Sequence, residues 1–149
     1  MTQYEISEPY EQAINDMAAV IHQCNVDRGW WNDLYEVLDL IEGDPTLSIN
    51  RCIQLKEKVR LWFEMSKAAL IHSEVSEMVE GMRKRSMDSH LPERMADEVE
   101  GADVFIRLLD LMAARDCDIG GAVGEKFEYN QERADHLPEN RQGLGGKLV

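Results

Sequence analysis

The sequence predicts an all-α protein of one domain, and three observations support this. Helix-forming residues, chiefly Ala, Leu, Glu, Met and Arg, dominate the composition. Only 4 prolines and 10 glycines interrupt the 149 residues. Runs in which Val, Ile or Thr alternate with polar residues, typical of half-buried strands, are absent. We assign residues 1–137 to this domain and 138–149, a segment rich in glycine after Pro138, to a mobile tail.

Apolar periodicity and turn residues divide the chain into five predicted helices. The third is capped by Ser48 or Asn50. It is long for a small domain, so we expect a break or kink near residues 62–67. Pro92 suits the first position of the fourth helix, and Asp118 can cap the fifth. The predicted helices cover about 9–26, 34–41, 49–85, 92–115 and 119–134.

The strong negative charge limits the classes of partner. With 29 acidic and 16 basic residues, the formal net charge is −13. A surface this acidic repels nucleic acid and anionic membranes, so neither is expected as a partner. A nucleotide carried as a metal complex remains compatible with it, because a bound cation inverts the local field.

The N-terminus and the cysteines predict a cytoplasmic protein. The first residues lack the basic and apolar regions of a signal peptide, and no apolar run approaches membrane-spanning length. The three cysteines are widely spaced and form no Cys-x-x-Cys pair, as expected of reduced thiols in the cytosol.

Two pairs of acidic residues mark the candidate site. Glu74 with Glu77, and Glu100 with Asp103, have the i, i+3 spacing that places both members side by side on one helix face. Each pair borders an apolar stripe, where uncompensated charge is costly. If the two helices pack antiparallel, four carboxylates meet at their seam and require a cation. The predicted core stripes are Ala68, Ile71, Val75, Met78 and Met82, and Met95, Val99, Ala102, Ile106 and Leu109.

The ligand types favour a hard divalent cation. Carboxylate oxygens suit Mg²⁺, with Mn²⁺ as the alternative. A di-iron site uses Glu-x-x-His and many zinc enzymes use His-Glu-x-x-His, and the sequence contains neither motif. Acidic residues are so numerous that such pairs also arise by chance on solvated helix faces, so spacing alone leaves both interpretations open.

A basic face on the last predicted helix is a candidate phosphate site. Lys126, Asn130 and Arg133 follow i, i+4, i+7 spacing and share one face. Two cations and an amide in line can grip a polyphosphate. The simpler alternative is a solvated basic face.

Residues before the second predicted helix are candidate nucleobase contacts. One of the adjacent tryptophans Trp30 and Trp31, with Trp31 as the candidate residue, can stack on a base. His22 and Asn25, one turn apart, can read base edges. Core packing of the tryptophans and a surface histidine are the simpler alternatives.

The segments around the acidic pairs also carry a family signature. Residues 70–77 read Leu-Ile-His-Ser-Glu-Val-Ser-Glu, with Glu80-Gly81 following, and residues 98–104 read Glu-Val-Glu-Gly-Ala-Asp-Val. In this Glu-x-x-Glu, spacer, Glu-x-x-Asp pattern the chain resembles the MazG-like nucleoside triphosphate pyrophosphohydrolases. Residues 29–33 and 91–147 are similar to the phage-encoded branch. The chain departs from the family pattern in the longer segment 34–60 and at Gly101, where a larger apolar residue is usual.

The resemblance implies a four-helix bundle, here with an extra short helix, that forms a homodimer or homotetramer with active sites near subunit interfaces. It implies hydrolysis of a (d)NTP to a (d)NMP and diphosphate. Glu77 is the expected general base. Lys126 and Arg133 would hold the β- and γ-phosphates, and Asn130 would orient phosphate or sugar. Two or three Mg²⁺ ions per site would be held by Glu74, Glu77, Glu100 and Asp103.

Substrate and class are left open by the sequence. Two tryptophans favour a purine such as dGTP, with broad dNTP activity as the alternative, in a nucleotide-pool enzyme of the host cytoplasm if the chain is phage-encoded. The alternative function is a non-catalytic helical protein that senses a nucleotide. A third is an assembly protein that uses its Met-rich stripes as an interface.

Overall fold

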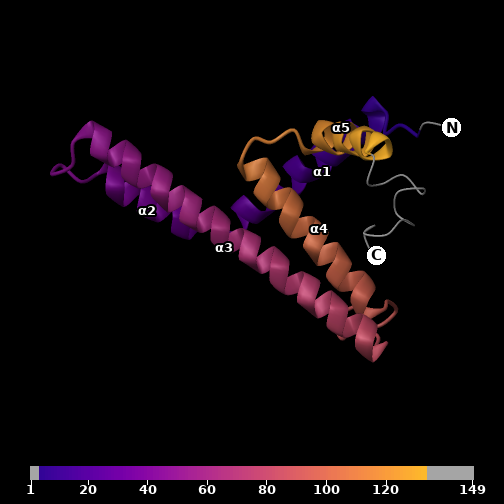
Figure 1. Ribbon diagram of the computed structural model, residues 1–149. Helices are drawn as coiled ribbons and strands as arrows, with labels where there is room; N and C mark the ends of the chain where they lie inside the picture. The colour runs from indigo at the N-terminus through magenta and orange to yellow at the C-terminus, as the bar shows by residue number, and fades with distance from the viewer. Residues whose placement is uncertain (1–3, 134–149) are drawn as a thin grey trace, which may run out of the picture.

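The computed structural model describes residues 4–133, which form five α-helices and no strand (Figure 1). The predicted all-α class is therefore confirmed. Residues 134–149 lie outside the described part, and so do the predicted tail 138–149 and the end of the last predicted helix. The helices are α1 (Glu8–Asp27), α2 (Asn32–Glu42), α3 (Ile49–Lys84), α4 (Ala96–Ala114) and α5 (Ile119–Glu132).

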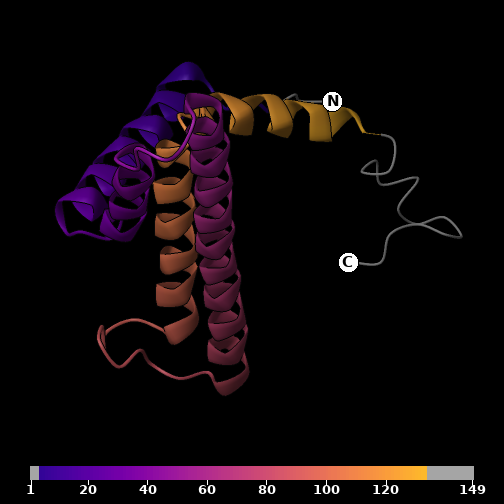
Figure 2. The same cartoon turned by 90° about the vertical axis from the view of Figure 1, so that its left-hand side faces the viewer.

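The longest helix, α3, runs without a break, so the predicted interruption at 62–67 is wrong. Its 36 residues contain no proline and only one glycine, near the C-terminal end. At 1.5 Å per residue they span about 54 Å. The helix is covered in two parts, since α2 packs beside its first half and α4 beside its second half (Figures 1 and 2). A long helix is stable here because separate elements pack against its two halves.

The connection between α3 and α4 is a folded loop. Arg85 ends α3 in the left-handed region, with φ of 51°. An isolated antiparallel bridge joins Met87 to Met95. Pro92 lies within this loop, and α4 begins only at Ala96, so the predicted start of the fourth helix at Pro92 is wrong. The tight loop brings α4 back antiparallel beside α3, as the site prediction required.

The remaining helices pack around this pair. α1 lies against α4, and α5 packs on α1 and extends away from the α3–α4 pair (Figure 2). The main core cluster lies where α2 and the turn before it meet α3 and α4. It consists of Trp31, Leu34, Leu38 and Leu111, with Phe63 and Ile71 among the half-buried residues around it. Within the described residues, no helix is both long and apolar enough to cross a membrane.

The apolar stripe predicted for the core of α3 is only partly correct. Ile71 and Met78 are half-buried, but Val75 is 36% and Met82 52% exposed. The residues that face α4 instead include Glu74 and Gly81, which are buried. On α4, Ala102 and Ile106 are exposed while Leu109 is fully buried. α3 has two apolar faces, and periodicity could not tell which of them packs within the chain.

The backbones of α3 and α4 lie close together at Gly81, and this gives a stability prediction. A Cβ at Gly81 would lie 2.7 Å from the backbone nitrogen of Asp97, which cannot move aside. We expect Gly81→Ala to lower the free energy of unfolding by about 1–3 kcal/mol, the usual cost of overpacking. The measurement is chemical denaturation followed by circular dichroism.

Gly101 provides the matched control. A Cβ there would lie 3.6 Å from Met78 Sδ, an ordinary van der Waals contact. Gly101→Ala should therefore stabilise the protein by up to about 1 kcal/mol, because alanine is the better helix former. Equal stability of the two variants would contradict the close approach at Gly81.

Candidate metal centre and adjoining pocket

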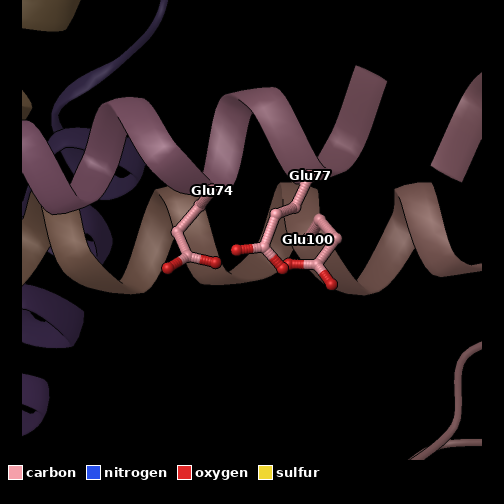
Figure 3. Close-up of side chains that lie close together, drawn as sticks. All are labelled: Glu74, Glu77 and Glu100. Atoms are coloured by element: carbon pink, nitrogen blue, oxygen red, sulfur yellow. The ribbon is translucent and has the colours of Figure 1, made fainter. Parts of the chain in front are cut away.

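The seam between α3 and α4 brings three of the four predicted acidic ligands together. One carboxylate oxygen from each of Glu74, Glu77 and Glu100 lies within 4.8 Å of the others. Figure 3 shows Glu74 and Glu77 on α3 and Glu100 on α4 pointing to the same side of the helix pair. Glu74 is buried, Glu100 is half-buried and Glu77 is exposed. The cluster is thus anchored in the helix interface and open to solvent on one side.

Asp103, the fourth predicted ligand, lies one turn further along α4. It is outside the 4.8 Å group and lines the adjoining pocket. Its carboxylate still interacts electrostatically with the cluster, since it is one of the groups that raise the pKa of Glu100. Asp103 therefore stands between the acidic cluster and the pocket.

Crowding of like charges perturbs the cluster. The pKa of Glu100 is raised above its usual value, first by burial and then by the charges of Glu77, Glu74 and Asp103. Glu74 is compensated by Arg107, whose Nη2 lies 2.9 Å from Glu74 Oε1. The cluster thus holds more negative charge than one arginine neutralises.

The donor set fits a hard divalent cation. All three ligands are carboxylates, which offer the oxygen atoms that Mg²⁺ and Mn²⁺ prefer. The uncompensated charge is a second reason, because a cation among the oxygens would offset the repulsion that acts together with burial to raise the pKa of Glu100. The three carboxylates are thus ligands of the type that a magnesium site uses, and the binding of Mg²⁺ itself stays a prediction.

The raised pKa of Glu100 predicts how stability depends on pH. The folded protein holds this proton above the ordinary pKa of 4.5, so the unfolded chain loses it first as pH rises. The contribution of Glu100 to stability is therefore greatest at low pH and is lost as pH rises from 4.5 through the raised pKa.

The substitution Glu100→Gln should remove this loss of stability at higher pH, because glutamine does not titrate. In the presence of a chelator, we expect its thermal midpoint, relative to wild type, to increase as pH rises from 4.5 through the raised pKa of Glu100. Saturating Mg²⁺ should reduce the increase, because a cation would replace the proton. A difference between the two proteins that is independent of pH would contradict the raised pKa of Glu100.

A buried acid that sequence reasoning missed organises the next part of the site. Asp110 on α4 is 6% exposed. Its Oδ1 lies 2.7 Å from His22 Nδ1 and accepts a hydrogen bond from Trp31 Nε1 at 3.1 Å. The signal was present, since Asp110 follows Asp103 by two helical turns and so shares its face. This network ties α1 and the turn before α2 to α4.

The network changes the roles predicted for two residues. Trp31 was predicted to bind substrate, but it is 2% exposed and packs against Phe63, which leaves no free face for a nucleobase. The neighbouring Trp30 is 60% exposed. His22 is held by Asp110 and contacts Trp31 edge-on. Both predicted contacts therefore support the internal structure of the site.

A pocket of about 230 Å³ lies beside the acidic cluster, between α1, α3 and α4. Asn25, a predicted base contact, is part of its wall. Lys67 and Arg107 line it as well and were not predicted. The complete lining is Asn25, Arg28, Trp30, Lys67, Leu70, Asp103, Ile106, Arg107 and Asp110.

The predicted basic face on α5 is not part of this pocket or of the acidic cluster within one chain. Lys126 Nζ lies 4.4 Å from the ring centroid of Tyr129, and the Arg133 guanidinium carbon lies 5.9 Å from it. The Oδ1 of Asn130 is buried without a hydrogen-bond partner among the described residues. The structure therefore places Lys126 and Arg133 beside the ring of Tyr129 on α5.

Comparisons of the chain with protein-family models, with curated proteins and with solved structures found no match. The family resemblance therefore stays a prediction from the sequence.

Proposed function

We propose that this protein is a Mg²⁺-dependent nucleoside triphosphate pyrophosphohydrolase that converts a (d)NTP and water to a (d)NMP and diphosphate. The observation that supports this most directly is the group of three carboxylates within 4.8 Å on the α3–α4 seam. Hydrolysis between the α- and β-phosphates needs cationic stabilisation of the phosphate oxygens and a base for water. The cluster provides ligands for the cation and candidates for the base.

In this proposal Glu74, Glu100 and Asp103 act mainly as metal ligands. Mg²⁺, when bound, supplies neutralisation of the negative charge that develops on the phosphate oxygens. Glu74 enters the site in a fixed position, because it is buried and paired with Arg107. A rigid ligand keeps the substrate oriented without further loss of entropy.

Glu77 is the proposed general base, as well as a ligand. It is the exposed member of the cluster and has no ion-pair partner among the described residues. Its carboxylate would accept the proton of the water that attacks the α-phosphorus. A P–O bond forms to this water, the bond from the α-phosphorus to the bridging oxygen breaks, and diphosphate leaves with the bonding pair.

We propose further that the active form is a homodimer, with a homotetramer as the alternative. The apolar residues Leu61, Met65, Val75, Val79 and Met82 are all at least 36% exposed along α3. Together with Ala68 and His72 they follow the alternating spacing of four and three residues that is typical of helix–helix seams. An exposed stripe of this length is typical of a subunit interface. In this proposal Lys126 and Arg133, which lie outside the pocket of their own chain, would add phosphate contacts to the site of a second copy.

The test is a panel of all NTPs and dNTPs with Mg²⁺ or Mn²⁺, read by pyrophosphate release and product analysis. We expect monophosphate and pyrophosphate in equal amounts over many turnovers, with dGTP among the best substrates. Stoichiometric binding without turnover would instead favour a nucleotide sensor.

A further inference from the structure

Lys67 on α3 is a half-buried cation that forms no ion pair with a carboxylate of the described residues, although Asp110 lines the same pocket. Its Nζ donates a hydrogen bond to the backbone oxygen of Trp30 at 3.0 Å and lies 4.8 Å from the ring centroid of Trp31. An ammonium carries three protons, so two remain for other acceptors. Burial is the main reason that the pKa of Lys67 is lowered, and the charge of Arg107 acts in the same direction, while the carboxylates of Asp110 and Asp33 act in the opposite direction. A desolvated cation in this state favours an incoming anion.

Lys67 shares its pocket with a second cation that faces the acidic cluster. Arg107 lines the same pocket while its Nη2 contacts Glu74 at 2.9 Å. A guanidinium has five N–H donors, so contact with one carboxylate leaves donors for a second ligand. Asp110, the buried acid of the pocket, already accepts hydrogen bonds from His22 and Trp31. The cations are therefore the groups with donors to spare.

The size and position of the pocket limit what it can hold. Its volume of about 230 Å³ is below the range of roughly 300–1,000 Å³ usual for whole small-molecule ligands. Asp103 and Arg107 connect it to the acidic cluster, so a group bound there would be part of a ligand that continues toward the cluster.

We propose that this pocket is an oxyanion subsite in which Lys67 and Arg107 bind the two terminal phosphates of the substrate and, after cleavage, free pyrophosphate. The inference rests on the proposed function and deepens it. It assigns the leaving diphosphate to residues of the same chain that carries the acidic cluster, and it leaves the nucleoside outside the pocket. Lys67 is then a substrate-binding residue whose charge stabilises the leaving group.

The test measures ligand binding to the full chain by calorimetry, with Lys67→Met, Lys67→Arg and the exposed control Lys58→Met beside wild type. Inorganic pyrophosphate at saturating Mg²⁺ should bind Lys67→Met about tenfold or more weakly than wild type. Lys67→Arg should stay within a few-fold of wild type, and Lys58→Met should be unchanged. Mn²⁺ binding without pyrophosphate should be the same in all four proteins, because Lys67 is not a metal ligand.

Further readouts separate this role from the alternatives. Lys67→Met should keep or raise the thermal midpoint, since it removes a costly buried charge, and a lower midpoint would indicate a structural role instead. Unchanged pyrophosphate affinity in Lys67→Met, or an equal loss of affinity for a deoxynucleoside without phosphate, would overturn the inference. If the wild type hydrolyses nucleotides but Lys67→Met binds pyrophosphate as wild type does, the subsite would be contradicted and the proposed hydrolase would not. Lys67-dependent pyrophosphate binding without turnover would support the subsite and contradict the proposed hydrolase.

Discussion

Glu74→Gln is expected to reduce pyrophosphate release about 100-fold or more while the helical circular-dichroism spectrum stays unchanged. The substitution removes the charge of the buried member of the carboxylate cluster but keeps its size. The fold should tolerate it, because Arg107, its ion-pair partner, is 38% exposed and can be solvated when the pair is lost. Asp103→Asn should have a similar effect on turnover.

The control for this prediction is Glu57→Gln, the same chemical change at an exposed position of the same helix. It should retain wild-type turnover. A second measurement addresses the metal directly: Mn²⁺ should raise the thermal midpoint of wild type and of Glu57→Gln, but much less that of Glu74→Gln. Unchanged turnover in both Glu74→Gln and Asp103→Asn would remove the metal role from these residues.

Local chemistry explains why so much of the fold could be predicted. Ser48 and Asp118 cap α3 and α5 as expected, through side-chain oxygens that accept from the backbone N–H of Arg51 and Gly121. These bonds join residues three positions apart, so the sequence is sufficient to predict them. The predicted start of α4 was wrong because it depends on contacts between residues further apart. The loop before α4 is held by a bridge that joins Met87 to Met95.

In the site, too, contacts within one helix could be predicted and contacts between distant residues could not. The i, i+3 spacing of Glu74 and Glu77 is a property of one helix, and antiparallel packing then sufficed to bring Glu100 to them. Asp110 and Trp31 are 79 residues apart, so their hydrogen bond could not be read from any spacing. Lys67 was missed because the burial of its side chain and its proximity to Arg107 arise only when α3 and α4 pack together.

The exposed stripe on α3 leads to the second prediction of large effect. The double variant Met65→Glu/Val79→Glu should separate the proposed dimer into monomers, weakening association by about 100-fold or more. Met65 and Val79 are 61% and 56% exposed, so within one chain the new carboxylates would remain solvated and the fold should persist. In a symmetric dimer each substitution occurs twice, and both the apolar contact and the neutrality of the interface are lost. Sedimentation velocity measures the association, and the nucleotide assay measures the activity.

Leu40→Glu is the matched control, because Leu40 is 68% exposed but lies on α2, away from the stripe. It should leave both the sedimentation coefficient and turnover unchanged. If α5 of a second copy completes the phosphate contacts, the monomeric variant should also lose activity, since Lys126 and Arg133 lie outside the pocket of their own chain. A wild-type protein that sediments as a monomer and still turns over nucleotide would contradict the interface. A monomeric double variant with full activity would instead confine the phosphate contacts to Lys67 and Arg107.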